Sequence, residues 1–70
     1  MTEKETLLHM IKNSRKGISI SYVCHGIECL KCYYLEDKNI CDYILTFDNQ
    51  IPEELYIKKF GYISLIEELL

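Results

Sequence analysis

The cysteines constrain the fold of this chain more than any other feature. All four fall between positions 24 and 41, in the spacing C-x4-C-x2-C-x8-C. The chain has only 70 residues, which allows one domain (residues 1–70) with a small hydrophobic core. Domains of this size commonly need a metal ion or disulfides for stability. Four soft thiolates so close in sequence suit a tetrahedral zinc ion, so we predict one structural Zn²⁺ whose ligands are Cys24, Cys29, Cys32 and Cys41.

The redox state of these cysteines depends on the compartment. The first residues, M-T-E-K-E, do not form a basic region followed by an apolar run, so we expect no secretory signal. No apolar stretch approaches the roughly 18 residues that a membrane span requires. We therefore expect a cytoplasmic protein without membrane contact. Thiols stay reduced in the cytoplasm, which favours metal binding over disulfides.

Other chemistries of the cysteine cluster fit less well. Cys24, Cys29 and Cys32 match the start of the plant-type ferredoxin ligand pattern, but Cys41 follows much sooner than the fourth ligand of that pattern. An iron–sulfur cluster is thus an alternative to zinc. His25 is an alternative ligand in place of one cysteine. A closed shell of four thiolates leaves no open position for catalysis, and the sequence shows no paired carboxylates, phosphate-binding loop or catalytic triad, so we expect no enzymatic activity.

The apolar patterns predict a small α+β fold stabilised by zinc. Thr2 and Glu5 have the spacing of a capping box, which predicts a helix to about Ser14 with Leu7, Leu8 and Ile11 on one face and Met10 at its edge. Alternating residues predict a strand over 18–23 that leads into the four-cysteine knuckle. The segment 33–41 resembles a hairpin, with a short helix over 29–35 as the competing prediction. A strand over 42–47 follows.

The C-terminal segment, residues 52–70, is predicted to be helical. Pro52 suits a first helical position, and Gly61 is the expected break. Ser64 and Glu67 form a second possible capping box. The sequence leaves open whether this segment is one kinked helix or two short ones.

The charge pattern bears on the class of partner. The formal net charge is −3, and four thiolates around one Zn²⁺ would bring it to −5. An acidic protein is a poor binder of phosphate backbones, so nucleic acid is disfavoured as a partner. The exception is the basic cluster of Lys12, Arg15 and Lys16, which supports a nucleic-acid-binding zinc knuckle as the alternative function.

The tyrosines point to a protein partner. Six tyrosines are many for so small a core, and tyrosine is favoured at interfaces because it offers a large contact area. Tyr33 and Tyr34 adjoin the C-x2-C pair, and two successive residues of a strand point to opposite faces. We therefore predict Tyr33 and Tyr34 as partner contacts.

The segment V-C-H-G-I-E-C-L-K-C-Y-Y-L-E-D-K-N-I-C resembles short four-cysteine zinc-binding proteins of phages and prophages. The resemblance covers residues 7–41 and rests on the C-x-G-x-x-C-x-x-C core. Such proteins are often inhibitors of host defence, anti-CRISPR proteins among them. The resemblance implies a phage-encoded inhibitor of a host defence nuclease, which would bind a larger host protein. The alternatives are the nucleic-acid-binding zinc knuckle and a small iron–sulfur electron carrier; the oligomeric state is left open.

Overall fold

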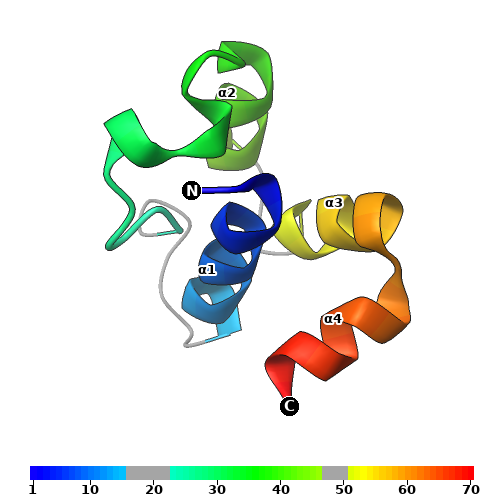
Figure 1. Cartoon of the computed structure of the whole chain (residues 1–70). Helices are drawn as coiled ribbons and strands as arrows, with labels where there is room; N and C mark the ends of the chain where they lie inside the picture. Colours follow the sequence, from blue (N-terminus) through cyan, green and yellow to red (C-terminus); the bar gives the residue numbers. More distant parts are fainter. Residues whose placement is uncertain (16–22, 47–50) are drawn as a thin grey trace.

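The computed structural model describes residues 1–15, 23–46 and 51–70 (Figure 1). Every regular element in these three ranges is helical: α1 (Glu3–Arg15), the 3₁₀ turns η2 (Cys29–Lys31) and η3 (Tyr33–Leu35), α2 (Lys38–Thr46), α3 (Ile51–Phe60) and α4 (Tyr62–Leu69). The predicted α+β class is therefore wrong for the described residues, which contain no strand. The strand predicted over 18–23 lies outside them except for Val23, which is in a turn.

Helix α1 begins as the capping box predicts. The Thr2 hydroxyl oxygen accepts a hydrogen bond from the Glu5 backbone N–H at 3.2 Å, and the Glu5 carboxylate accepts the Thr2 N–H at 3.4 Å. The buried face of α1 carries Leu7, Met10 and Ile11. Met10, predicted at the edge of this face, is only 2% exposed, so it belongs to the core.

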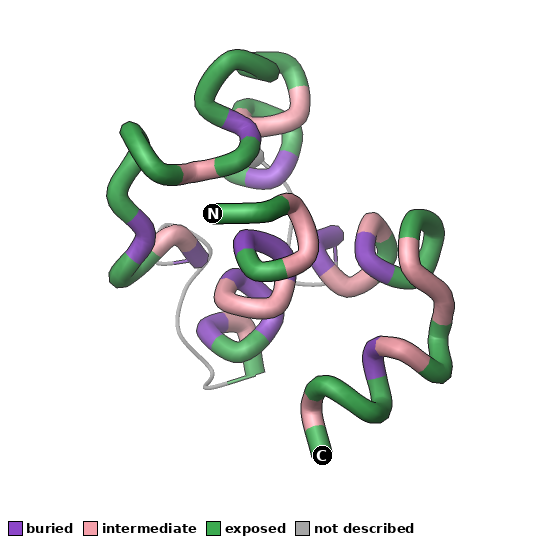
Figure 2. The backbone as a smooth tube through the Cα atoms, in the orientation of Figure 1, coloured by how far each residue is buried: buried purple, intermediate pink, exposed green. Residues whose placement is uncertain are grey.

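Helix α1 occupies the middle of the molecule. It lies between α3 and the part of the chain that carries the cysteines, residues 23–46, which we call the cysteine lobe (Figure 1). Figure 2 shows that buried residues cluster along α1 and on the faces turned toward it. The core draws on every helix of the described residues; its buried apolar members are Leu7, Met10, Ile11, Val23, Ile27, Tyr34, Ile44, Ile51, Tyr56 and Leu65.

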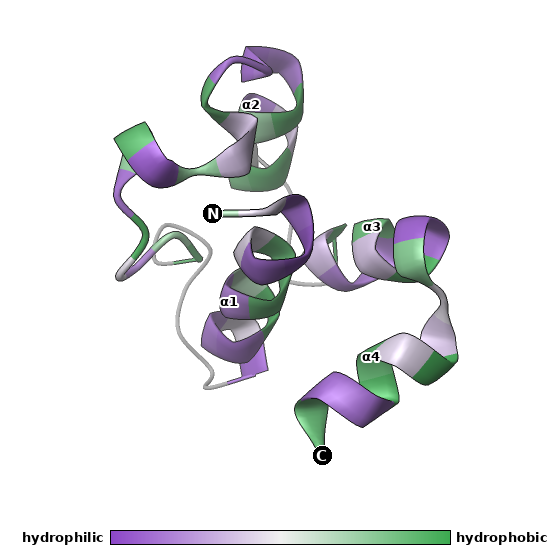
Figure 3. Ribbon diagram, viewed as in Figure 1, coloured by the Kyte–Doolittle hydropathy of each residue, from purple (hydrophilic) through white to green (hydrophobic). Residues whose placement is uncertain are grey.

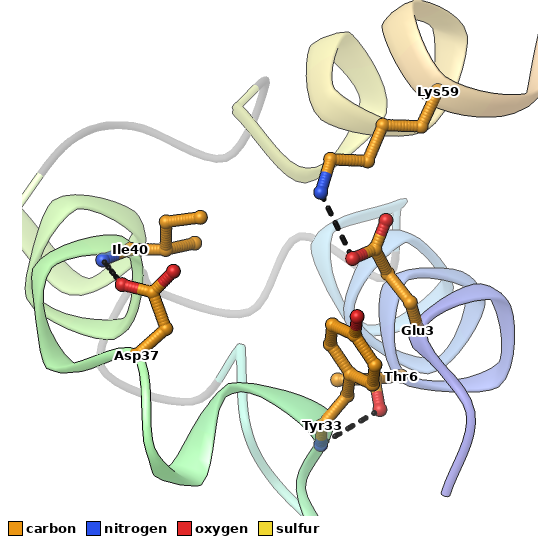
Figure 4. Close-up of polar contacts among 6 residues, drawn as sticks. All are labelled: Glu3, Thr6, Tyr33, Asp37, Ile40 and Lys59. Carbon is orange, nitrogen blue, oxygen red and sulfur yellow. Dashed lines mark hydrogen bonds and ion pairs between the residues drawn. The ribbon is translucent and has the colours of Figure 1, made fainter.

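Helix α2 replaces the predicted hairpin and the strand predicted over 42–47. The Asp37 carboxylate caps this helix, because its Oδ1 accepts the Ile40 backbone N–H at 3.2 Å (Figure 4). Ile40 and Ile44 are one helical turn apart, and both pack against the core. The apolar run therefore follows helical spacing, and the hairpin and strand predictions are wrong for residues 38–46.

The C-terminal segment forms two helices that meet at Gly61. Gly61 has φ 89° and ψ 156°, a conformation that residues with a side chain rarely adopt, so the chain breaks where the sequence predicted. Helix α4 begins at Tyr62 and has no side-chain cap, so the second capping box, at Ser64, is wrong. None of the helices in the described ranges is long and apolar enough to cross a membrane.

Ion pairs connect the ends of α1 to the C-terminal helices. The pairs of Lys4 and Arg15 join exposed or partly exposed side chains and contribute little stability, whereas the Glu3 side chain is only 14% exposed in its pair with Lys59. The pairs are Glu3–Lys59 at 2.9 Å (Figure 4), Lys4–Glu68 at 2.8 Å and Arg15–Glu53 at 3.2 Å.

Candidate metal centre

The four cysteines line a single cavity of about 250 Å³ in the cysteine lobe. They reach it from different segments: Cys24 from the turn at 23–26, Cys29 and Cys32 from either end of η2, and Cys41 from α2. All four are free thiols. The rest of the wall is apolar except for one lysine; it consists of Ile27, Tyr34, Leu35, Lys38 and Leu45.

Four cysteine thiols are suitable ligands for zinc, but their sulfur atoms are not arranged around one point as metal ligands are. Among the described residues, no three His, Cys, Asp or Glu side chains converge closely enough to hold a metal ion. Four cysteine thiols are nevertheless the type of donor set that a closed tetrahedral zinc site uses. Zinc binding therefore requires the segments that carry the thiols to close around the ion, which couples metal binding to the folding of this lobe.

The thiols influence one another electrostatically. Burial raises the pKa of Cys24 to about 11, and repulsion from the thiolates of Cys32, Cys41 and Cys29 adds to this shift. Burial also raises the pKa of Cys41, with Cys32 as the next contributor, while the charge of Lys38 opposes the shift. Burial thus favours the neutral thiol at Cys24 and at Cys41.

The turn that carries Cys24 is attached to α1. Asn13 is 4% exposed, and its side-chain amide donates to the carbonyl oxygens of Val23 at 2.8 Å and His25 at 2.9 Å. The Nε2 atom of His9 lies 2.8 Å from the same His25 oxygen and donates to it when it carries the proton. These contacts fix the backbone on both sides of Cys24.

The sequence did not identify Asn13 as a residue that holds the turn at 23–26. Its only signal is position: it follows Met10 by three residues and so lies on the buried face of α1, where a polar side chain needs a partner. Gly26 in the same turn has φ 81°, and a Cβ atom there would lie 3.0 Å from His9 Nε2. The backbone conformation therefore favours glycine, and a larger residue would also have to displace the His9 imidazole slightly.

His25, the alternative ligand, does not contribute to the cavity. Its side chain is exposed and is not part of the wall that the four cysteines share. What His25 supplies is its backbone carbonyl, which joins the turn to α1.

The two tyrosines predicted as partner contacts lie in different environments. Tyr33 is 53% exposed, whereas Tyr34 is 1% exposed and packs in the core, so only Tyr33 is accessible to a partner in this conformation. Their rings meet edge to face with centroids 5.2 Å apart. The Tyr33 backbone N–H donates to the Thr6 hydroxyl at 3.4 Å, which places η3 against α1 (Figure 4). Burial raises the pKa of Tyr34 well above its usual value.

The cysteine lobe carries further exposed apolar side chains besides Tyr33. Leu30 is 85% exposed, Leu35 48% and Leu45 41%, and Leu35 and Leu45 also form part of the cavity wall. Figure 3 shows hydrophobic and hydrophilic residues interspersed along the ribbon of the cysteine lobe.

Comparison with known proteins gives no identification. No family model, no curated protein and no solved structure matches this chain.

Proposed function

We propose that this chain is a zinc-stabilised protein-binding module without catalytic activity, in which Cys24, Cys29, Cys32 and Cys41 hold one structural Zn²⁺. The observation that carries the proposal is that all four cysteines line the same cavity, although they come from three segments of the chain. Four thiolates complete the zinc shell, so no position remains for a substrate.

The metal would stabilise a part of the chain that has little regular structure of its own. In the cysteine lobe only α2 is an α-helix; the remainder consists of turns and two three-residue 3₁₀ turns. A zinc ion would join the turn at 23–26, η2 and α2 at one point. The lobe would then present a rigid surface, which reduces the entropy lost on docking.

The partner surface that we propose is the group of exposed apolar side chains on this lobe: Leu30, Tyr33, Leu35 and Leu45. Exposed apolar groups of this kind commonly mark protein interaction sites, and tyrosine is a frequent anchor residue. The partner would be a larger protein in the cytoplasm of the host cell. The more specific role, inhibition of a host defence nuclease in the manner of anti-CRISPR proteins, rests on the resemblance to phage proteins alone.

A capture experiment with matched variants tests the binding function. The zinc-loaded chain is immobilised and exposed to a lysate of the host cell, beside the variant Leu30→Ser/Tyr33→Ala, neither residue of which lines the cavity, and the control Ile63→Ser. Ile63 is 72% exposed but lies on α4, outside the cysteine lobe. We expect the captured protein to be lost with the first variant and with a zinc chelator, and retained with the control. Equal capture by all three chains would contradict the proposed surface.

The second candidate function is a nucleic-acid-binding zinc knuckle. The structure leaves fewer residues of its basic cluster available to phosphate groups than the sequence suggests. Arg15 pairs with Glu53 at 3.2 Å, and Lys16 lies outside the described residues. Lys12 is exposed. Salt-sensitive binding of DNA or RNA at physiological ionic strength, lost in Lys12→Ala/Arg15→Ala, would favour this candidate. A visible absorption spectrum distinguishes an iron–sulfur carrier from both zinc-based candidates, because zinc thiolates do not absorb visible light.

A further inference from the structure

We infer that Lys38 compensates the negative charge of the zinc site and thereby raises its affinity for Zn²⁺. The inference rests on the zinc ligation proposed above. Its starting point is that Lys38 lines the same cavity as the four thiols. Among the described residues of that wall, Lys38 is the only one with a cationic side chain.

The charge of the complete site requires compensation. Four thiolates around one Zn²⁺ carry a net charge of −2. Ile27, Leu35 and Leu45 in the wall are apolar and cannot stabilise that charge, and Tyr34 offers a neutral hydroxyl only. Lys38 is an exposed residue at this wall, and a positive charge near the thiolates lowers the free energy of the charged, metal-bound form relative to the neutral thiols.

Lys38 does not stabilise the helix in which it lies, so helix stability does not account for a lysine at this position. Lys38 is the first residue of α2, and a cation in the first turn of a helix is unfavourable because the helix dipole is positive there. It also forms no ion pair with the carboxylates of the described residues, whereas Lys31 in the same lobe pairs with Glu28 at 3.6 Å.

What the position of Lys38 does provide is proximity to a ligand. Lys38 precedes Cys41 by three residues on α2, so the two side chains lie on the same face of the helix. Lys38 is therefore a positioning residue: its positive charge stabilises the thiolates, and its side chain does not bind the metal.

The test is the zinc dissociation constant, measured by competition with a chelating dye for the wild type, Lys38→Met, Lys38→Arg and Lys38→Glu. Substitution of a side chain that interacts with the metal ligands typically lowers metal affinity by about 10-fold or more. We expect Lys38→Met to bind zinc about 10-fold more weakly and Lys38→Glu more weakly still. We expect Lys38→Arg to stay within about 2-fold of wild type, because it retains the charge.

Lys31→Met is the matched control, since it removes a lysine of the same lobe that does not line the cavity. Its affinity should stay close to wild type. The unfolding midpoint of metal-free Lys38→Met should be unchanged or higher, which separates the effect of charge from a loss of structure. Equal zinc affinity of Lys38→Met and wild type, or an equal loss in Lys31→Met, would overturn the inference and leave the zinc site standing. Failure of the wild-type chain to bind stoichiometric zinc would overturn the zinc site itself.

Discussion

The side-chain amide of Asn13 donates a hydrogen bond of 2.8 Å to the backbone carbonyl of Val23. Because Val23 directly precedes Cys24, this contact connects the central helix to the first of the proposed zinc ligands. A second bond from the same amide, to His25, holds the other side of Cys24. The position of one thiol therefore depends on a residue ten or more positions away in the sequence.

Removal of this amide should destabilise the protein. Asn13→Ala deletes two hydrogen bonds of a buried side chain and removes a donor from the Val23 and His25 carbonyls, of which His25 keeps its contact with His9, so we expect the free energy of unfolding to fall by about 2–3 kcal/mol. Urea unfolding followed by far-UV circular dichroism measures it. Ser14→Ala is the control, because it removes only the bond from the Ser14 hydroxyl to the Met10 carbonyl on the same helix. A loss as small as that of the control would contradict the role of Asn13.

Gly26 is the second point at which the turn depends on α1. Gly26→Ala places a Cβ atom 3.0 Å from His9 Nε2 at a backbone φ of 81°. We expect it to lower the free energy of unfolding by about 2 kcal/mol, from backbone strain and from the displaced imidazole. In a His9→Ala background the same substitution should cost less, because part of the clash is gone. Identical costs in the two backgrounds would show that the contact with His9 has no effect.

The cap of α2 stabilises the helix that carries Cys41. Asp37→Ala removes the acceptor for the Ile40 backbone N–H, and we expect a loss of about 1 kcal/mol in the free energy of unfolding. Asp42→Ala removes the same charge from an exposed position within α2 and should change it by less than about 0.5 kcal/mol. The difference between the two variants in thermal or urea unfolding is the measured quantity; no difference would argue against the cap.

Local signals in the sequence predicted the parts of the fold that local interactions determine. The capping box of Thr2 and Glu5 predicted the start of α1, and Gly61 predicted the break between α3 and α4. Both depend on residues within a few positions of one another. The grouping of the four cysteines around one cavity also followed from their short spacing.

The wrong predictions, the hairpin and the strand, concern residue types that are favoured in two kinds of local structure. Asp37 was interpreted as part of a hairpin turn, but aspartate is favoured both in turns and at helix N-caps. The following run contains β-branched and aromatic residues, and a short apolar run does not distinguish a strand from a buried helix by its period. Packing of Ile40 and Ile44 against the core decides in favour of the helix. The buried state of Tyr34 likewise depends on contacts with α1 that no local pattern reveals.

The identity of the ligands is tested by paired substitutions. Cys32→Ser should abolish stoichiometric zinc binding, because three thiolates bind zinc more weakly than four. His25→Ala should keep one zinc ion per chain, since the His25 side chain is exposed and does not line the cavity. Elemental analysis of the purified, gel-filtered variants gives the ratio of zinc to protein. Zinc lost from His25→Ala and kept in Cys32→Ser would mean that the imidazole is a ligand and Cys32 is not.

The central claim is that Cys24, Cys29, Cys32 and Cys41 together form one zinc site. X-ray absorption spectroscopy of the zinc-loaded protein at the zinc edge tests it most directly, because it reports the type, number and distance of the ligand atoms. We expect a first shell of four sulfur atoms at about 2.3 Å and no nitrogen or oxygen ligand. A shell with fewer sulfur atoms and one or more nitrogen or oxygen ligands would contradict it.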